Sequence, residues 1–350
     1  MAKREMMNGN VAMAESALRG GADFFAGYPI TPQSPFTEYL STRMEELGRE
    51  FVQAESEVSS VNMLLGASAA GARAITATAG MGFSLMQEGI SWMSAGRLPG
   101  IFVQLQRGGA GASGGGPSQT DYNLCTKTLG HGGNHAYVLA PETVQEAADL
   151  MYEAPEFADK YRCIVLFLSD GMVAQVMEPV ELKEFKKLEP RDYACCGKHG
   201  RDHNNMANQI MDWNLYGPPG NVVQEEMYKK WEEEELKLEE YYMDDAEVVL
   251  FAWGTAARIA RGAIDNLREQ GYKVGMLRPI TLFPFPNKYL SELDPEKVKH
   301  LVVAEVAVPA QTFLDVDRAV KDRVPIHSFA RAWGAIFSTE EVEEELKKYL

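Results

Sequence analysis

The sequence predicts an α/β protein with two domains in which parallel strands alternate with helices. The chain has 350 residues, 45% of them hydrophobic and 24% charged, which is enough for two cores of common domain size. Short apolar stretches alternate with amphipathic ones in both halves of the chain, as β-α-β units require. We therefore expect a first domain over residues 1–185, a connection over residues 186–244 and a second domain over residues 245–350.

The composition excludes several classes of protein. A net charge of −16 disfavours nucleic-acid binding, which needs clustered Lys and Arg. No apolar run approaches the roughly 20 residues of a membrane helix, and the first residues lack the apolar region of a signal peptide, so we expect no membrane association and a cytoplasmic location. The cysteines form neither a disulfide framework nor a CxxCxxC motif, so any iron–sulfur cluster must lie on another chain.

The first expected strand, residues 23–27, leads into a turn that contains Pro29 and Pro32. The two prolines stiffen this turn and hold Thr31 at the carboxyl end of the strand, where open α/β sheets bind ligands. A simpler interpretation is a plain connector in which Thr31 or Ser34 caps the helix that follows.

Two acids, Glu55 and Glu57, stand at the entrance of the next helix, after a strand-like start at Phe51. Acids in the first turn of a helix favour its dipole, so both can be explained by helix stability alone. The alternative is that one of the two does chemistry. The motifs around this stretch favour that second interpretation.

Glycines follow each of the next two expected strands. After the strand at residues 74–79, Gly80 and Gly82 open a helix, and such a turn lets a ligand or a partner backbone come close. The strand at residues 100–106 ends in Arg107, followed by GGAGASGGG. Exposed N–H groups beside an Arg can form an anion-binding nest, and Arg suits bidentate recognition of a carboxylate. The alternative is a flexible surface loop.

A further strand (136–139), helix (142–160) and strand (163–169) complete the expected parallel layer of the first domain. Residues 181–241 then show no strand alternation and end in the acidic run WEEEELKLEEYY. This pattern predicts a long connection that ends in a solvated helix.

The connection contains a possible metal site. Cys195, Cys196, His199 and His203 combine adjacent cysteines with two histidines four residues apart. Zinc sites normally pair their cysteines as CxxC, and no second ligand pair follows at finger spacing. We therefore predict no metal site on this chain and leave the four residues as an open question.

The second domain is expected to begin with a β-α-β unit. A strand from Glu247 leads through Gly254 and Thr255 into a helix and then a second strand at residues 273–277. Gly254 does not open a GxGxxG sequence, so the dinucleotide-binding fingerprint is absent. A strand, a helix and an acidic closing helix at residues 340–350 follow.

Several motifs together resemble one known family. The chain is similar to the α subunit of a thiamine diphosphate-dependent 2-oxoacid:ferredoxin oxidoreductase, and most similar to the branched-chain type that oxidises 2-oxoisovalerate. The motifs that carry the resemblance are GYPITPQSP (27–35), VQAESEV (52–58), TATAGMGFSLMQEGISW (77–92), QRGG (106–109), PSQTDY (117–122), LSDGMVAQVMEPVEL (168–182) and LRPITLFPFP (277–286). They span both expected domains.

The resemblance implies a fold and an activity. The fold is a thiamine pyrimidine-binding-type domain followed by a smaller transketolase C-terminal-like α/β domain. The activity is the oxidative decarboxylation of a 2-oxo acid to its acyl-CoA, with electrons passed to ferredoxin. Alternatives are 2-oxoglutarate or another 2-oxo acid as substrate, a non-redox enzyme of transketolase type, and a non-catalytic binding protein.

The resemblance also implies roles for particular residues. Glu57 matches the catalytic glutamate that binds the pyrimidine of the cofactor, and Gly66, nine positions later as in the family, supports Glu57 over Glu55. Thr31 and Arg107 match the residues that hold the oxygens of the substrate. The cofactor-binding set is completed by Pro29, Gly80 and Gly82.

One departure from the family pattern and one absent motif limit what this chain can do alone. The loop after Arg107 lacks the usual Gly-Pro, which leaves the lining of the substrate pocket open. The GDG motif that anchors Mg²⁺ and diphosphate is also missing, and Ser169-Asp170-Gly171 is its nearest equivalent. The resemblance therefore implies a β subunit that binds diphosphate and Mg²⁺, a γ subunit, and a ferredoxin-like subunit with [4Fe-4S] clusters, together with ferredoxin and coenzyme A.

Overall fold

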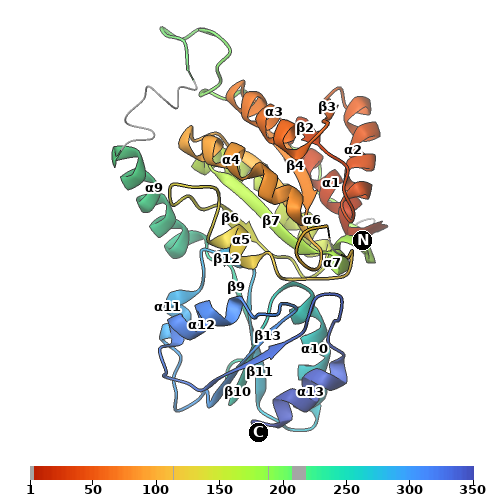
Figure 1. Cartoon of the computed structure of the whole chain (residues 1–350), viewed down its shortest axis with the longest axis vertical. Coiled ribbons are helices and arrows are strands. Elements are labelled where there is room, and N and C mark those ends of the chain that lie inside the picture. Colours follow the sequence, from red (N-terminus) through yellow and green to blue (C-terminus); the bar gives the residue numbers. More distant parts are fainter. Residues whose placement is uncertain (1–3, 113, 188, 207–217) are drawn as a thin grey trace.

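The computed structural model describes residues 4–112, 114–187, 189–206 and 218–350. Its two main sheets lie one above the other in Figure 1, each covered by helices. Most neighbouring strands are parallel, which confirms the expected α/β class.

The larger sheet has the strand order β12-β6-β7-β5-β4-β2-β3, and β12 with β6 is its antiparallel pair. Its strands are β2 (Phe24–Gly27), β3 (Glu50–Gln53), β4 (Ala74–Ala79), β5 (Gly100–Gln106), β6 (Tyr137–Leu139), β7 (Ile164–Asp170) and β12 (Thr281–Phe283). The strands predicted in the first half of the chain are present at nearly the predicted bounds.

Helices cover both faces of this sheet. One face carries α1 (Gly9–Gly20), α2 (Ser34–Glu46) and α6 (Val144–Tyr161), and the other carries α3 (Glu57–Ala69), α4 (Met81–Ala95) and α5 (Tyr122–Thr126). Strand β5 shows how the sequence fills both layers. Ile101 and Val103 pack with the first group of helices, whereas Phe102 packs with the second, because successive side chains of a strand point to opposite faces.

The smaller sheet has the strand order β14-β13-β10-β11-β9. Its strands are β9 (Leu238–Tyr241), β10 (Val248–Phe251), β11 (Val274–Pro279), β13 (His300–Glu305) and β14 (Ile326–Ala330). One face is covered by α10 (Gly254–Glu269) and α13 (Thr339–Lys347), and the other by α11 (Asn287–Ser291) and α12 (Thr312–Val320). No helix in the described ranges is long and apolar enough to cross a membrane.

The acidic run at residues 231–242 is not the solvated helix that we expected. It begins as a short π-helix, Trp231–Glu235, and continues into β9, which pairs antiparallel with β11. Trp231 is fully buried in the core of the larger sheet, against Tyr137 and Phe157. Burial of one large indole therefore anchors the run, while the acids around it stay near the surface. Helix α9 (Pro218–Lys230) precedes it.

Short strands missed by the sequence interpretation link distant parts of the chain. β12 comes from the second half of the chain but extends the larger sheet beside β6. β1 (Arg4–Asn8) and β8 (Met177–Glu181) form a separate antiparallel pair. The larger sheet is thus completed by a strand from the second half.

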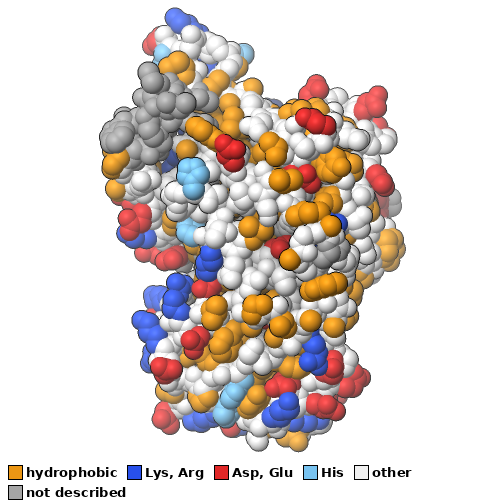
Figure 2. All heavy atoms as spheres, in the orientation of Figure 1, with side chains coloured by type: hydrophobic (Ala, Val, Ile, Leu, Met, Phe, Trp, Pro, Cys, Tyr) orange, Lys and Arg blue, Asp and Glu red, His pale blue; other side chains and the backbone are white. Residues whose placement is uncertain are grey.

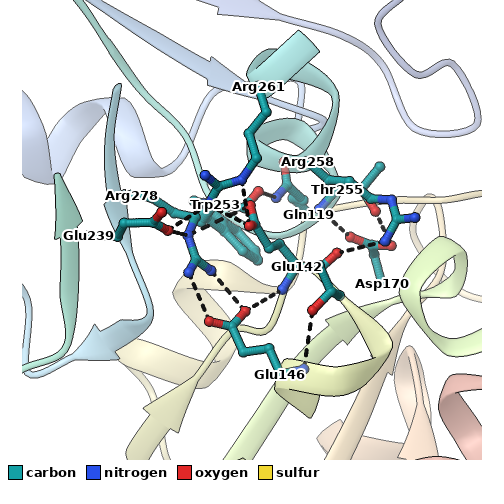
Figure 3. Close-up of polar contacts among 11 residues, drawn as sticks. Gln119, Glu142, Glu146, Asp170, Glu239, Trp253, Thr255, Arg258, Arg261 and Arg278 are labelled. Atoms are coloured by element: carbon teal, nitrogen blue, oxygen red, sulfur yellow. Dashed lines mark hydrogen bonds and ion pairs between the residues drawn. The ribbon is translucent and has the colours of Figure 1, made fainter. Parts of the chain in front are cut away.

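A buried network of charges lies between the two sheets (Figure 3). Arg278 on β11 is 4% exposed, and its guanidinium contacts Glu146 of α6 at 2.8 and 2.9 Å and Glu239 of β9 at 2.6 Å. Arg261 of α10 contacts Glu142 and Glu239 at 2.5 Å each. Buried charges persist where they are paired and hydrogen-bonded, so this network holds the second half of the chain in place against the first.

Candidate active site

The candidate residues lie where three neighbouring strands of the larger sheet end. Thr31 follows β2, Gly80 follows β4 and Arg107 follows β5, while Glu57 begins α3. β2, β4 and β5 are adjacent and parallel, so their carboxyl ends meet at one edge of the sheet. That edge is where ligands bind in open α/β sheets.

Glu57 is not needed to start its helix. Ser56 is the N-cap of α3, and its side chain accepts a hydrogen bond from the Ser59 N–H at 3.2 Å. Glu55 is exposed and accepts a hydrogen bond from the Ser59 hydroxyl. These residues satisfy the helix start locally. Glu57 instead turns into the protein, where it is 5% exposed.

The Glu57 carboxylate has no polar partner in the part of the chain that the structure describes. Gly82 leaves it room, because a β-carbon at Gly82 would lie 2.5 Å from Glu57 Oε1 and 2.2 Å from Thr78 Oγ1. The Thr78 hydroxyl is also buried without a hydrogen-bond partner. Since buried polar groups are normally hydrogen-bonded, this pair suits a polar ligand that supplies the missing donor and acceptor.

The structure brings Arg107, Thr31 and Gly80 together. Arg107 Nη1 donates a hydrogen bond to the Thr31 carbonyl at 3.0 Å. The same side chain lies against Gly80, where a β-carbon would be 3.2 Å from Arg107 Nε, and Gly80 has a φ of +52° that favours glycine. Arg107 Nε is buried without a hydrogen-bond partner, so part of the guanidinium is available to an anion.

The capping interpretation of the Thr31 turn is wrong. The N-cap of α2 is Gln33, which makes no side-chain capping hydrogen bond, and a proline, Pro35, lies in the first turn. Thr31 is exposed, as is Pro29 in the same turn. Helix capping by Thr31 therefore does not explain this turn.

Sequence reasoning overlooked buried polar residues beneath the candidate site. Gln104 and Gln106 on β5 are fully buried, and Gln104 Oε1 and Gln106 Nε2 lack partners. The Gln104 amide donates to the Gly80 carbonyl at 3.2 Å and to Asp121 at 2.8 Å, and burial raises the pKa of Asp121. Like Thr78, these residues interrupt apolar strands at alternate positions. That alternation was a signal in the sequence that buried polar side chains lie below the site at this edge of the sheet.

Asp170, the nearest equivalent of a metal anchor, is already saturated. It is 2% exposed and caps α7 (Gly171–Gln175), with Oδ1 accepting from the Met172 N–H at 2.9 Å and the Val173 N–H at 3.2 Å. Thr255, at the start of α10, donates its hydroxyl to Oδ1 at 2.6 Å and its N–H to Oδ2 at 3.0 Å (Figure 3). Asp170 therefore joins the two halves of the chain and has little capacity left for a cation.

No metal centre forms among the residues that the structure describes. No three His, Cys, Asp or Glu side chains in those ranges come close enough to share an ion. Cys195 is half-buried and Cys196 is exposed, and both thiols are free. The four residues of the connection are thus not gathered into a ligand set.

Comparisons with known proteins bear on the family and the fold. Residues 15–215 match a family model described as pyruvate flavodoxin/ferredoxin oxidoreductase, thiamine diphosphate-binding, and residues 246–342 match pyruvate:ferredoxin oxidoreductase core domain II. The ketoisovalerate oxidoreductase subunit VorB of Methanothermobacter marburgensis is 43% identical over 83% of this chain and 82% of its own. The 2-oxoglutarate synthase subunit KorA of Methanocaldococcus jannaschii is 33% identical over 97% of this chain and 98% of its own.

Solved structures show the same fold. The 2-oxoglutarate:ferredoxin oxidoreductase of Magnetococcus marinus superposes with a TM-score of 0.86 at 24% identity, over 99% of this chain, and this chain spans 65% of that longer one. An inactive split-gene transketolase tetramer superposes with a TM-score of 0.60 at 14% identity. The predicted fold is therefore confirmed, and so is the predicted family. This chain belongs to the 2-oxoacid:ferredoxin oxidoreductases, as an α-type subunit of an oxidoreductase that works with partner subunits.

Proposed function

We propose that the chain provides the pyrimidine side of a thiamine diphosphate site in an enzyme that oxidatively decarboxylates a branched-chain 2-oxo acid. The observation that carries the proposal is the Glu57 carboxylate, which is buried against Gly82 without a partner at the edge of the sheet that also presents Arg107. A carboxylate that accepts no hydrogen bond within the chain can accept one from a ring nitrogen that carries a proton.

The residues present fit the cofactor. Thiamine diphosphate supplies the nucleophilic carbon and the electron sink that decarboxylation of a 2-oxo acid needs. Glu57 would hold a proton at Oε1 against the pyrimidine, and Gly82 leaves room for the ring to approach. Pro29 and Gly80 border the same strand ends and complete the proposed cofactor-binding set.

Arg107 and Thr31 would hold the substrate. The part of the guanidinium not engaged with the Thr31 carbonyl can bind the carboxylate of a 2-oxo acid, and the exposed Thr31 side chain can donate to its oxo oxygen. In the overall reaction the 2-oxo acid loses CO₂, its acyl group joins the thiol of coenzyme A, and the electron pair leaves for ferredoxin with release of the thiol proton. The carboxylate held by Arg107 is the leaving group in this scheme.

A branched, uncharged substrate side chain is favoured by two observations. The relatives from Methanothermobacter, at 43% identity, are ketoisovalerate oxidoreductase subunits. Residues 108–121, which follow Arg107, contain no Lys or Arg that could pair with the second carboxylate of 2-oxoglutarate. An unpaired charge in a closed site would be very costly, so 2-oxoglutarate is the less favoured substrate.

Partner subunits would complete the site. Because Asp170 is saturated, a β subunit would hold Mg²⁺ and the diphosphate, and further subunits, γ and ferredoxin-like, would carry the [4Fe-4S] clusters. Helices α3 and α4 expose apolar side chains beside Glu57, namely Val58, Met63, Met81 and Leu85. Figure 2 shows hydrophobic side chains over this face. Such an exposed apolar face is where a partner would close the pocket.

The test is the activity of the complex purified from its native source. We expect bound thiamine and iron, and coenzyme A-dependent reduction of ferredoxin with a higher kcat/KM for 2-oxoisovalerate than for 2-oxoglutarate. Comparable kcat/KM values for the two acids would contradict the substrate assignment. A complex with thiamine but without iron or electron transfer would indicate a transketolase-type enzyme instead.

A further inference from the structure

The glycine-rich loop after Arg107 is shaped around one side chain from the second half of the chain. A β-carbon at Gly108 would lie 2.2 Å from Trp333 Cε3, and one at Gly114 would lie 2.7 Å from Trp333 Cζ3. A β-carbon at Gly116 would lie 2.7 Å from the Cα of Gly334. These glycines are therefore required by contact with residues 333–334, which distinguishes the loop from a flexible surface segment.

Backbone hydrogen bonds hold the two segments together. The Gly108 N–H donates to the Gly116 carbonyl at 3.2 Å, which closes the loop, and the Gly334 N–H donates to the Pro117 carbonyl at 2.9 Å. Two residues further on, Gln119 exchanges hydrogen bonds of 2.8 Å with Val306 through its backbone N–H and its side-chain oxygen. The loop next to Arg107 is thus positioned by the second half of the chain.

The indole also presents apolar surface beside the candidate site. Trp333 is 43% exposed although its ring edge packs on Gly108, the residue that follows Arg107. The loop itself offers only Gly, Ala, Ser and Pro side chains between residues 108 and 118, so it cannot supply a large apolar wall. An exposed large aromatic ring at a binding edge is a common anchor for an apolar ligand group.

We propose that Trp333 is a specificity-determining residue that lines the pocket for the aliphatic side chain of the 2-oxo acid. This inference rests on the proposed function, because it places the substrate carboxylate on Arg107. Every 2-oxo acid carries that carboxylate, so Arg107 cannot discriminate between them. Discrimination between 2-oxo acids must come from the surfaces that contact the substrate side chain. Trp333 packs on Gly108, the residue that follows Arg107.

Two pairs of variants test the inference in the purified complex. Trp333→Ala removes the indole, whereas Trp333→Phe keeps an aromatic ring. Gly108→Ala places a β-carbon in the volume of the indole, whereas Gly115→Ala, in the same loop, meets no atom within 4 Å. We measure kcat/KM for 2-oxoisovalerate and for pyruvate, which share the carboxylate and the oxo group but differ in the side chain.

We expect Trp333→Ala and Gly108→Ala to lower the ratio of kcat/KM for 2-oxoisovalerate over pyruvate about tenfold, the usual worth of a hydrophobic pocket contact. Trp333→Phe and Gly115→Ala should keep most of the ratio. An unchanged ratio, or equal losses for both acids, would overturn the inference, because equal losses mean that Trp333 only supports the fold or Arg107.

A second measurement needs neither cofactor nor partner. Hydrogen exchange in the isolated chain should accelerate at Gly108 and Gln119 in Trp333→Ala and Gly108→Ala but not in Gly115→Ala, and unchanged exchange would refute the contact. The two proposals fail separately. A wild-type complex inactive on every 2-oxo acid refutes the proposed function, whereas an active complex with an unmoved ratio refutes the role of Trp333.

Discussion

Two buried carboxylates, Glu57 and Asp170, have opposite surroundings. Both are almost inaccessible, at 5% and 2% exposure, and both belong to residues at the start of a helix. Asp170 accepts hydrogen bonds from three residues on both sides of the contact between the two halves of the chain. Glu57 accepts none from the described residues. The chain itself therefore fills the hydrogen-bonding capacity of Asp170 but leaves that of Glu57 unused.

The difference supports the proposal that Asp170 serves stability and Glu57 serves ligand binding. Among the described residues no donor is engaged by the Glu57 carboxylate, which leaves its oxygens free for a ligand. The unpaired atoms of Thr78 and Arg107 lie at the same strand ends as Glu57. By contrast, Thr255 donates two hydrogen bonds to Asp170. Substitutions at the two carboxylates should accordingly separate activity from stability.

The largest effect is expected from Glu57→Gln. Turnover of the complex should fall by about 10² to 10⁴, the usual contribution of a positioned proton-transfer group. The melting temperature of the isolated chain should not fall, because a neutral amide costs less to bury than a carboxylate. Glu55→Gln is the control, since Glu55 is exposed, and its turnover should match wild type. Equal or reversed losses of turnover would show that Glu57 is not the catalytic acid.

Asp170→Ala should lower the stability of the chain, unlike Glu57→Gln, which should lower turnover. Removing the carboxylate leaves the Thr255 hydroxyl and N–H without an acceptor, and we expect the free energy of unfolding to fall by about 3 kcal/mol in urea titrations. Asp170→Asn keeps one acceptor oxygen and should lose less. If Asp170→Ala left stability unchanged but abolished Mg²⁺-dependent cofactor binding, Asp170 would be a metal ligand and the contrast with Glu57 would disappear.

Gly82→Ala tests the space around Glu57 without changing a charge. The added β-carbon would lie 2.5 Å from Glu57 Oε1, so the carboxylate must move. A misplacement of about 1 Å in a catalytic group costs about 10² in turnover. Gly66→Ala is matched, because Gly66 is also helical and its β-carbon meets no atom within 4 Å. That control should keep its turnover and gain up to about 1 kcal/mol in stability. Full turnover in Gly82→Ala would place the cofactor elsewhere.

The smallest effect concerns the charge network between the sheets. Burial raises the folded-state pKa of Glu142 above its ordinary 4.5, although Arg278 and Arg261 lower it in part. A raised folded-state pKa means that the native state binds the proton more tightly than the unfolded state. Stability from this group is therefore present below pH 4.5 and lost as the pH rises through the folded-state pKa.

Glu142→Gln should remove this contribution and flatten the dependence of unfolding free energy on pH above 4.5, measured by urea titration of the isolated chain. Glu240→Gln, on the neighbouring surface of β9, is a suitable control because Glu240 is exposed. A steeper fall of stability with pH in Glu142→Gln than in wild type would contradict the direction of the shift.

Much of the fold could be predicted from the sequence because buried parallel strands leave a strong local signal. Strands such as residues 74–79 and 100–106 are mostly apolar runs with a glycine at one end, and the structure has both. The acidic run at residues 231–242 was misread because a single residue, Trp231, decides its packing through tertiary contacts. The short strand β12 was missed for the same reason, since its partner β6 lies in the other half of the chain.

The candidate site was predicted less completely than the fold. The motifs identified Thr31, Glu57 and Arg107, and the structure places them at one strand edge, but no local pattern distinguishes a satisfied carboxylate from an unsatisfied one. Asp170 differs from Glu57 in capping its own helix and in accepting two hydrogen bonds from the distant Thr255. Trp333 could not be found either, because its contact with Gly108 depends on how the two halves of the chain meet.

Isothermal titration of the purified chain with thiamine diphosphate and Mg²⁺ tests the central claim most directly. The claim is that this chain provides only the pyrimidine side of the cofactor site. Glu57 would bind the pyrimidine, and Asp170 would not bind Mg²⁺. We expect no binding at micromolar concentrations by the chain alone, and binding once the diphosphate-binding subunit is added, before any redox subunit is present. Micromolar Mg²⁺-dependent binding by the isolated chain would contradict the account and reveal an anchor within it.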